Sequence, residues 1–278
     1  MLPTASDPSV RWPYLKRHEM RIVLVTGATG AIGKAIARQI AGRPDTEVVL
    51  ACRNAQKAGQ AVREIVETTG NRRVRYELVD VSRKSSIQAL AERWRGPLHV
   101  LVNDAAVTPR RREETPEGIE LQLATNVLGY FWMIQAFADH LERSAPSRVI
   151  NVASYWAGDL DLADLEFRRR HYDNNQAYRQ SKQADRMLTA AFAERLGPRG
   201  ISVNACHPGD VRSALSNNLG FGGHQTPDEG ARTPVWLALE PIGHEQSGKY
   251  FEQTQAVCCP FASDRESVNG LYEACLRF

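Results

Sequence analysis

Hydrophobic residues gather in six short runs along this chain, and a longer stretch of mixed polarity separates each run from the next. Runs of this length that are rich in Val, Ile and Leu are typical of strands buried on both faces of a sheet. The predicted strands lie at residues 22–25, 47–52, 74–79, 98–103, 148–152 and 201–206.

The stretches between these runs have the alanine, leucine, glutamate and arginine content and the spacing of amphipathic helices. They predict helices at 34–41, 56–68 and 85–94, over a long span through Asn126 and Phe137, and at 178–196. Strands that alternate with helices indicate a single-domain α/β fold, a doubly wound parallel sheet (Rossmann-like) with helices on both faces. In such folds the ligand crevice lies beyond the carboxyl ends of the strands.

The 278 residues are within the range of one α/β domain, and we predict a folded domain at 20–278. Residues 1–19 carry Pro3, Pro8 and Pro13 and no apolar run, which predicts a flexible N-terminal tail. No stretch approaches the roughly 20 consecutive apolar residues of a membrane-spanning helix. The sequence therefore predicts no membrane span.

Charge and cysteine usage narrow the choice of partners and compartment. The formal net charge is only +3, so nucleic acid is not a favoured partner, and the arginine runs at 110–112 and 168–170 are interpreted as solvated loop faces. Five cysteines without C-x-x-C spacing predict neither a disulfide framework nor a zinc site, and they favour a reducing cytoplasm. The seven histidines include no His-x-x-x-His pair, so we predict no metal site.

A glycine-spaced turn follows the first predicted strand. Gly27, Gly30 and Gly33 allow a tight turn, a close approach of the backbone to a pyrophosphate, and close packing of the next helix on the sheet. Because a strand precedes this turn and a helix follows it, we predict a dinucleotide site rather than a plain strand-to-helix turn. The other predicted cofactor contacts in the turn are Thr29, Ala31 and Ile32.

Two residues at the ends of the next strands indicate which nucleotide binds. Arg53 stands about 20 residues past the last glycine, where an acidic residue would bind the ribose of NAD, and it can instead meet the 2′-phosphate of NADP. A solvated arginine at a strand end is the alternative. Asp80 follows the third strand and is suited to bind the adenine amino group, or else it caps a helix ahead of Ser82.

Tyr178 and Lys182 form the most informative pair in the sequence. Four positions apart on a helix, they lie on one face, so the ammonium can favour the phenolate. This attraction predicts that the pKa of the Tyr178 hydroxyl lies below the usual value of about 10. A tyrosine activated in this way is a usable proton donor.

Taken with their flanking residues, these motifs resemble the short-chain dehydrogenase/reductase family, and most of all its retinol dehydrogenase-type branch, from Arg21 to the C-terminus. Several ordered motifs at such intervals are hard to obtain by chance. Besides the glycine turn and the Tyr178/Lys182 pair, the matching motifs are Ala51-Cys52-Arg53, Asp80-Val81-Ser82, Asn103-Asp104-Ala105-Ala106, Thr125-Asn126-Val127-Leu128-Gly129, Asn151-Val152-Ala153-Ser154 and His207-Pro208-Gly209-Asp210-Val211-Arg212-Ser213.

The resemblance implies a catalytic tetrad of Asn126, Ser154, Tyr178 and Lys182. Ser154 would polarise a substrate carbonyl, Tyr178 would protonate it, and Lys182 would also bind the nicotinamide ribose of NADP. Asn126 would stabilise a helix irregularity and a water chain. The implied partners are a small-molecule carbonyl or alcohol substrate and further copies of the chain, as a homodimer or homotetramer. The remaining implied cofactor contacts are Val81, Asn103, Ala105, Ala106, Pro208, Gly209, Val211 and Ser213.

The sequence departs from the branch at two motifs. Ala31 replaces the middle glycine, and Gly30 stands one position earlier, which resembles the epimerase-like extended subgroup. Asp104 and Ala106 replace the usual Asn and Gly of the motif after the fourth strand, which predicts altered packing or cofactor affinity with retained chemistry.

Other classes of protein explain the sequence less well. A serine hydrolase would need glycines at Val152 and Trp156, two positions either side of Ser154. An extended-type nucleotide-sugar epimerase or dehydratase would need a large substrate domain after residue 210. A non-catalytic NADP-binding sensor or scaffold on the same fold remains an alternative, although the complete tetrad argues against it.

The predicted substrate is a bulky, largely apolar ketone or aldehyde, or the corresponding alcohol. It would approach beneath residues 213–227, where apolar side chains alternate with glycines that give the flexibility of a closing lid. Tyr155 and Trp156 would add aromatic walls beside the catalytic serine. The alternative is that the apolar side chains only pack this loop onto the body. The apolar residues of the predicted lid are Leu215, Leu219 and Phe221.

Overall fold

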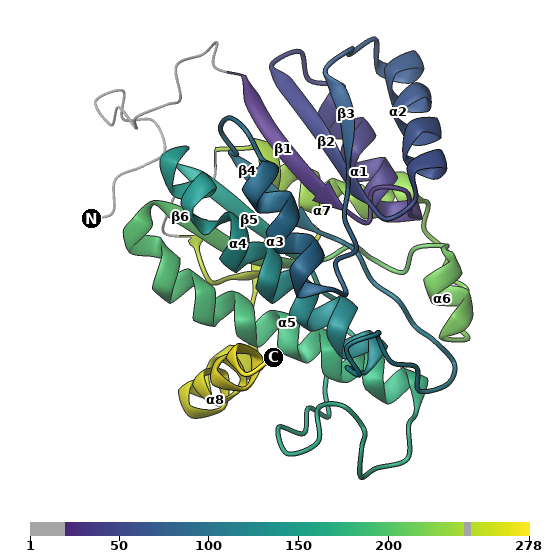
Figure 1. The fold of residues 1–278 in the computed structure, drawn as a ribbon, viewed down its shortest axis with the longest axis vertical. Helices are drawn as coiled ribbons and strands as arrows, with labels where there is room; N and C mark the ends of the chain where they lie inside the picture. The colour runs from purple at the N-terminus through teal and green to yellow at the C-terminus, as the bar shows by residue number, and fades with distance from the viewer. Residues whose placement is uncertain (1–19, 242–245) are drawn as a thin grey trace.

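One eight-stranded sheet runs through the centre of the computed structural model, which describes residues 20–241 and 246–278 (Figure 1). The predicted flexible tail at 1–19 lies outside the described residues. The strand order is β3-β2-β1-β4-β5-β6-β7-β8. The strands are β1 Arg21–Thr26, β2 Thr46–Cys52, β3 Val74–Leu78, β4 Val100–Asn103, β5 Ser147–Val152, β6 Ile201–His207, β7 Tyr250–Glu252 and β8 Gln255–Val257.

The pairing of the strands locates the ligand crevice. All neighbours from β3 to β7 are parallel, and β8 pairs antiparallel with β7 through a tight turn at Gln253 and Thr254. The strand order reverses at β1, which has β2 on one side and β4 on the other. In doubly wound sheets this reversal opens a crevice beyond the carboxyl ends of the strands. The glycine turn, Asp104 and Ser154 all follow such ends.

Helices cover both faces of the sheet (Figure 1). Helices α1, α2 and α7 pack on one face, while α3, α4 and α5 pack on the other, with α8 against the outer side of α5. Each face encloses its own cluster of buried Val, Leu, Ile and Ala side chains. The helices are α1 Ala31–Ala41, α2 Ala55–Thr69, α3 Lys84–Arg93, α4 Gly129–Arg143, α5 Asn174–Leu196, α6 Ala214–Asn218, α7 Pro227–Leu239 and α8 Arg265–Leu276.

The predicted doubly wound α/β fold is confirmed, and each of the six predicted strands overlaps an observed one. Helix α1 begins three residues before the predicted start, because Gly30 serves as an extended N-cap directly after the turn. The pattern predicts none of α6, α7, α8, β7 and β8. The strands β7 and β8 have three residues each, too few to show an alternation of apolar and polar positions.

The predicted long helix through residue 126 begins with a π-helical turn, η1 Leu123–Leu128, which continues directly into α4. A π-turn inserts an extra residue into the helical ladder and is frequent at functional sites. Asn126 lies inside this turn and is completely buried. The irregularity therefore occurs at the position where the sequence places a tetrad member.

Candidate active site

The glycine turn between β1 and α1 leaves no room for side chains. Gly27 has a φ of +67°, and a Cβ there would lie 2.8 Å from the backbone of Ala105. A Cβ on Gly33 would lie 2.5 Å from the carbonyl oxygen of Gly27. Helix α1 begins at Ala31, and its N-cap Gly30 makes no side-chain cap hydrogen bond. This cradle of backbone N–H groups at a helix N-terminus is suited to the pyrophosphate of a dinucleotide.

Two other predicted contacts lie close to this turn. Thr29 lies close enough to Cys52 to lower the pKa of its thiol, although burial raises that pKa to about 11. Arg53 follows β2 directly and is exposed. Since Thr26 and Ala51 are register partners, the ends of β1 and β2 are adjacent, and Arg53 lies at the same edge of the sheet as the glycine turn.

Asp80 lies after β3 and holds the loop ahead of α3. Its Oδ1 accepts hydrogen bonds from the Ser82 hydroxyl at 2.7 Å and the Ser82 N–H at 3.0 Å. Helix α3 has Arg83 as its N-cap, so the alternative role of Asp80 as a cap of this helix is not seen. Val81 packs against the start of α4, where its carbonyl oxygen would lie 2.8 Å from a Cβ on Gly129.

The motif at the end of β4, residues 103–106, packs against the glycine turn. Asn103 is completely buried, and its Nδ2 donates to Oδ1 of Asn151 in the neighbouring strand at 3.0 Å. The N–H groups of Asp104 and Ala105 both donate to the Thr26 hydroxyl, at 2.9 and 3.2 Å. The Asn103 side chain therefore contacts the neighbouring strand β5, while the backbone of Ala105 contacts the glycine turn. Ala106 comes next and is partly buried.

Asp104 brings a carboxylate to the phosphate cradle. Its Oδ2 would lie 2.7 Å from a Cβ on Gly33, and burial raises its pKa to about 7, although the Lys182 ammonium and the Gly33 N–H pull the pKa downward. An anion at this place competes with the pyrophosphate that the glycine turn would hold, because both are negative and close to the same N–H groups. The departure from the family motif therefore lies beside the glycine turn that is suited to a pyrophosphate.

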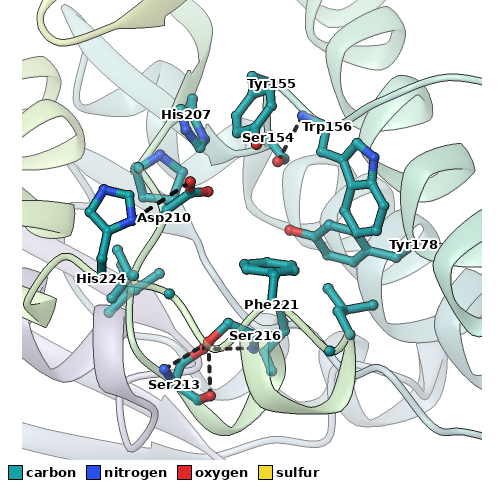
Figure 2. Close-up of a pocket in the computed structure, with 18 residues that line it drawn as sticks. Ser154, Tyr155, Trp156, Tyr178, His207, Asp210, Ser213, Ser216, Phe221 and His224 are labelled. Atoms are coloured by element: carbon teal, nitrogen blue, oxygen red, sulfur yellow. Dashed lines mark hydrogen bonds and ion pairs between the residues drawn. The ribbon is translucent and has the colours of Figure 1, made fainter.

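Ser154 and Tyr178 meet at a cavity of about 340 Å³ (Figure 2). Ser154 follows β5, Tyr178 lies in the second turn of α5, and both side chains line this cavity, where Ser154 lowers the pKa of the Tyr178 hydroxyl. The Ser154 hydroxyl accepts the Trp156 N–H at 3.1 Å. A paired serine and tyrosine at a cavity wall can together polarise and protonate a bound carbonyl oxygen.

Lys182 lies one turn after Tyr178 on α5, behind the cavity wall. Its Nζ is 5.9 Å from the centre of the Tyr178 ring and donates to the Val152 carbonyl at 3.0 Å. Burial raises the pKa of Tyr178 above its usual value, while Lys182 and Ser154 lower it by less. The expected attraction by Lys182 is present, but the predicted net lowering of the Tyr178 pKa is wrong, because desolvation of the buried phenolate outweighs it.

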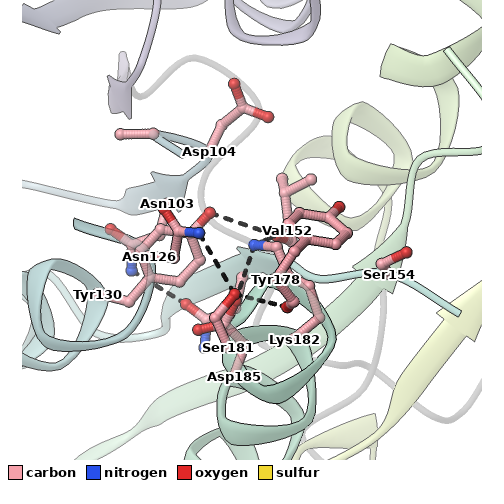
Figure 3. Close-up of polar contacts among 12 residues, drawn as sticks. Asn103, Asp104, Asn126, Tyr130, Val152, Ser154, Tyr178, Ser181, Lys182 and Asp185 are labelled. Carbon is pink, nitrogen blue, oxygen red and sulfur yellow. Dashed lines mark hydrogen bonds and ion pairs between the residues drawn. The ribbon is translucent and has the colours of Figure 1, made fainter. Parts of the chain in front are cut away.

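Asn126 connects three parts of the site (Figure 3). Its Oδ1 accepts the Val107 N–H at 2.8 Å, and its Nδ2 donates to the Val107 carbonyl at 3.1 Å. The same Nδ2 lies 3.3 Å from the hydroxyl of Ser181, which stands between Tyr178 and Lys182 on α5. The structure therefore brings the four predicted tetrad residues into one region of the fold.

The loop after β6 forms the opposite wall of the cavity. Gly209 has a φ of +100°, and a Cβ there would collide with the side chain of Gln225. Ser213 caps α6 through a reciprocal pair of hydrogen bonds with Ser216. The predicted contact residues that line this wall are Pro208, Gly209, Val211 and Ser213.

Sequence reasoning missed several polar residues at the site. Asp185 is completely buried beside Lys182, and its spacing of three positions on a helix is a signal that could have revealed the pair. His207 packs against Tyr155 with ring centroids 4.7 Å apart, and Nδ1 of His224 lies 4.0 Å from a carboxylate oxygen of Asp210. His207, Asp210 and His224 line the cavity. The first two belong to the motif from His207 to Ser213, several of whose other members the sequence predicts as cofactor contacts, while no local spacing signals His224.

The described residues can be searched for a metal cluster, a membrane-spanning helix and a disulfide. Within 20–241 and 246–278, no cluster of three or more His, Cys, Asp or Glu side chains is arranged to hold a metal ion. None of the helices in this part of the chain combines the length and apolar character needed to cross a bilayer. All five cysteines are described and are free thiols.

These features define a dinucleotide-dependent oxidoreductase class. The chain belongs to the short-chain dehydrogenase family, whose model, described as short chain dehydrogenase, matches residues 21–221. Members of this family use nicotinamide cofactors. The fold, the glycine turn and the tyrosine–lysine spacing are all explained by this membership.

Individual relatives agree with the assignment. Retinol dehydrogenase 13 of Mus musculus is 35% identical over 273 residues, which cover 91% of this chain and 81% of that protein. Retinol dehydrogenase 12 of Homo sapiens is 36% identical, over 83% of this chain and 77% of that protein. An uncharacterised protein from Mycobacterium paratuberculosis superposes with a TM-score of 0.79 at 26% identity, over 93% of both chains. A short chain dehydrogenase from Burkholderia cenocepacia in complex with NADP gives 0.66 at 25% identity, over 84% and 96%.

Proposed function

We propose that this protein is an NADP(H)-dependent oxidoreductase that interconverts the carbonyl and alcohol forms of a bulky apolar substrate, with Tyr178 as acid and base. The observation that carries the proposal is the placement of the Ser154 and Tyr178 side chains on the lining of one cavity, with Lys182 directly behind Tyr178. Such a pair serves proton transfer to an oxygen atom, which hydride transfer requires.

The chain's own residues divide the work of the reaction. The nicotinamide, when bound, supplies or accepts the hydride. Ser154 donates a hydrogen bond to the substrate oxygen, and Tyr178 passes its hydroxyl proton to that oxygen as the carbonyl is reduced. Lys182 stabilises the phenolate that remains, and the Tyr178 phenolate takes the proton back when an alcohol is oxidised. Asn126 joins the π-turn to the loop after β4 through Val107, and to α5 through Ser181.

The preference for NADP rests on Arg53. An exposed guanidinium at the end of β2, at the same sheet edge as the glycine turn, can form a charge-assisted contact with a 2′-phosphate. A structural relative of 25% identity is described in complex with NADP, which supports this choice. The proposed contact set also includes the backbone of the turn, Asp80, and the loop after β6.

The lining of the cavity supports an apolar substrate. Trp156 packs edge-on against Phe221 with ring centroids 5.8 Å apart, and Leu215 and Leu219 line the same cavity (Figure 2). Phe221 remains 47% exposed although it is large and hydrophobic, so its ring is available to a ligand. Relatives named retinol dehydrogenases, whose names imply a large apolar alcohol, agree with this substrate class.

Turnover of a carbonyl panel tests the proposal. We expect purified protein to oxidise NADPH in the presence of a retinoid-like or polycyclic ketone or aldehyde, and to reduce NADP⁺ with the corresponding alcohol. Tight NADPH binding without turnover of any carbonyl would favour the sensor or scaffold alternative. Conversion of nucleotide sugars without net oxidation would favour the epimerase or dehydratase alternative.

We further propose that the protein is cytoplasmic and forms a homodimer or homotetramer. Size-exclusion chromatography with light scattering tests the oligomeric state.

A further inference from the structure

A second buried charge faces the catalytic lysine from its own helix. Nζ of Lys182 donates to Oδ2 of Asp185 at 2.8 Å and to the Val152 carbonyl at 3.0 Å (Figure 3). The two residues are three positions apart on α5, and their relative exposures are only 2% and 1%. The ammonium also lies 5.1 Å from the centre of the Tyr130 ring on α4. The lysine is therefore held on several sides before any ligand binds.

The pair is poorly satisfied for a purely structural ion pair. Oδ1 of Asp185 is buried and has no hydrogen-bond partner among the described residues. Removing two charges from water costs several kcal/mol per ion, and this cost is recovered only when the geometry and the remaining hydrogen bonds are good. A buried carboxylate with one oxygen that accepts no hydrogen bond is not explained by a contribution to folding stability, so a functional role must be considered.

We propose that Asp185 is a positioning residue that holds the Lys182 ammonium against the Val152 carbonyl and tempers its pull on the Tyr178 proton. The inference deepens the proposed function and rests on the assignment of Tyr178 as the acid. Without Asp185, the ammonium would act on the phenolate at full strength, and the Val152 carbonyl would be its one remaining hydrogen-bond acceptor among the described residues, beside the Tyr130 ring.

The charges around Tyr178 make the direction of this effect definite. The groups whose charges or dipoles act on Tyr178 are Lys182, Ser154, Asp104 and Asp185; Tyr130 and Cys275 lie near Asp185, and Cys206 lies near Tyr130. Lys182 is the one cation in this set, and Asp104 and Asp185 are its anions. Burial raises the pKa of Asp185 to about 6, so the carboxylate is charged at pH 7 and above. A negative charge near a phenol disfavours the phenolate and keeps the Tyr178 pKa high.

The substitution Asp185→Asn tests the proposal, because asparagine keeps the shape and one hydrogen-bond acceptor and removes the charge. We expect the titration of Tyr178 to move to lower pH by about one unit. Tyrosine labelled with ¹³C at the ζ carbon reports this titration directly by NMR, and Tyr178→Phe identifies the resonance among the eight tyrosines. In carbonyl reduction, the alkaline limb of kcat/KM should move to lower pH by the same amount.

Two further variants separate charge from packing. Asp185→Glu restores the charge and should move the Tyr178 titration back toward that of the unmodified protein. Glu194→Gln, on the same helix in an exposed pair with Arg265, should leave both profiles in place. If the asparagine variant does not fold, Asp185→Ser, which is smaller and can still accept a hydrogen bond, takes its place under the same criteria.

An unchanged Tyr178 titration in a folded, charge-neutral variant would overturn the proposal. The NMR titration needs no substrate, so its outcome is independent of the proposed reaction. A lowered Tyr178 titration in a protein that reduces no carbonyl would refute the proposed function and leave the role of Asp185 in place.

Discussion

Nδ2 of Asn126 lies 3.3 Å from the hydroxyl of Ser181, and this contact joins the π-turn at the start of α4 to the helix that carries the acid. Ser181 in turn donates to the backbone carbonyl of Tyr178 at 2.8 Å. The relative position of the two helices is therefore fixed next to the proposed proton donor. A group whose hydroxyl must meet a substrate oxygen within hydrogen-bond distance depends on such support.

Removal of the Tyr178 hydroxyl should abolish most of the activity. In Tyr178→Phe the ring remains and the acid is lost, so we expect kcat for carbonyl reduction to fall roughly 10²- to 10⁴-fold. NADPH binding, measured by calorimetry, should change little. Tyr272→Phe on α8 is the matched control, because its ring packs on Phe131 and Phe192 far from the cavity, and its kcat should be unchanged. A steady-state rate in Tyr178→Phe equal to that of the unmodified protein would refute the mechanism.

Much of the fold could be predicted because its signals are local. Six of the seven residues of β2 are buried, and the pattern identifies this strand to within one residue at its N-terminal end. The glycine turn can also be predicted from the sequence, because its geometry requires glycines: Gly27 takes a positive φ, and Gly33 packs directly on the carbonyl oxygen of Gly27. Tyr178 and Lys182 share a helix face, so their spacing alone places them together.

The remaining features depend on contacts that no local pattern contains. Helix α7 packs against α1 although Pro234 stands within it, and its capping box of Thr226 and Glu229 is a start signal that the hydrophobic pattern alone does not reveal. The pKa of Tyr178 depends on how deeply α5 is buried, which the spacing to Lys182 cannot show. The side chain of Asn103 turns into the sheet because a partner, Asn151, is available on β5.

Arg53 should decide the choice of nucleotide. We expect kcat/KM to favour NADPH over NADH, and Arg53→Ala should reduce this preference by roughly ten- to a hundredfold, as expected for one charge-assisted hydrogen bond. The loss should lie mainly in the affinity for NADPH, which fluorescence titration measures without a substrate. Arg277→Ala, at the exposed end of α8, controls for a change in net charge. Equal efficiency with both cofactors in the unmodified protein would contradict the assignment.

Asp104 should make stability depend on pH. Its pKa is about 7 in the folded protein and about 3.9 in an unfolded chain. The folded state therefore binds the extra proton between these values, so the stabilisation is complete below pH ~4 and is lost as the pH rises through 7. In Asp104→Asn this loss is absent. From pH 5 to pH 8 we expect the free energy of unfolding of the variant to fall less than that of the unmodified protein, by roughly 2 to 3 kcal/mol.

Urea unfolding at both pH values measures this difference, and the exposed Asp45→Asn serves as the control. The buried acids Glu120 and Asp185 also have raised pKa values and contribute a slope of the same sign in all three proteins. The asparagine at position 104 should also tighten NADPH binding at pH 8, because it removes an anion from the phosphate cradle. Parallel pH slopes for Asp104→Asn and the unmodified protein would show that Asp104 is ionised in the folded state throughout this range.

The aromatic pair at the cavity should set the size and polarity of the substrate. Phe221 lies against Trp156, and the glycines on either side of it have positive φ values that favour a mobile segment. If this segment closes over an apolar ligand, Phe221→Ala should lower kcat/KM for a retinoid-like or polycyclic carbonyl by roughly ten- to a hundredfold. A small polar carbonyl, which cannot reach the ring, should be turned over at an unchanged low rate.

Phe261→Ala offers a control for the loss of a phenyl ring, because Phe261 packs by α5 and α8 under the Arg186 guanidinium, away from the cavity lining. Its kcat/KM should change equally for both substrates or for neither. The decisive quantity is the ratio of the two efficiencies, since a general loss of stability lowers both in proportion. If the unmodified protein prefers the small polar carbonyl and Phe221→Ala leaves that ratio unaltered, then Phe221 only packs the loop onto the body, and the apolar lid must be abandoned.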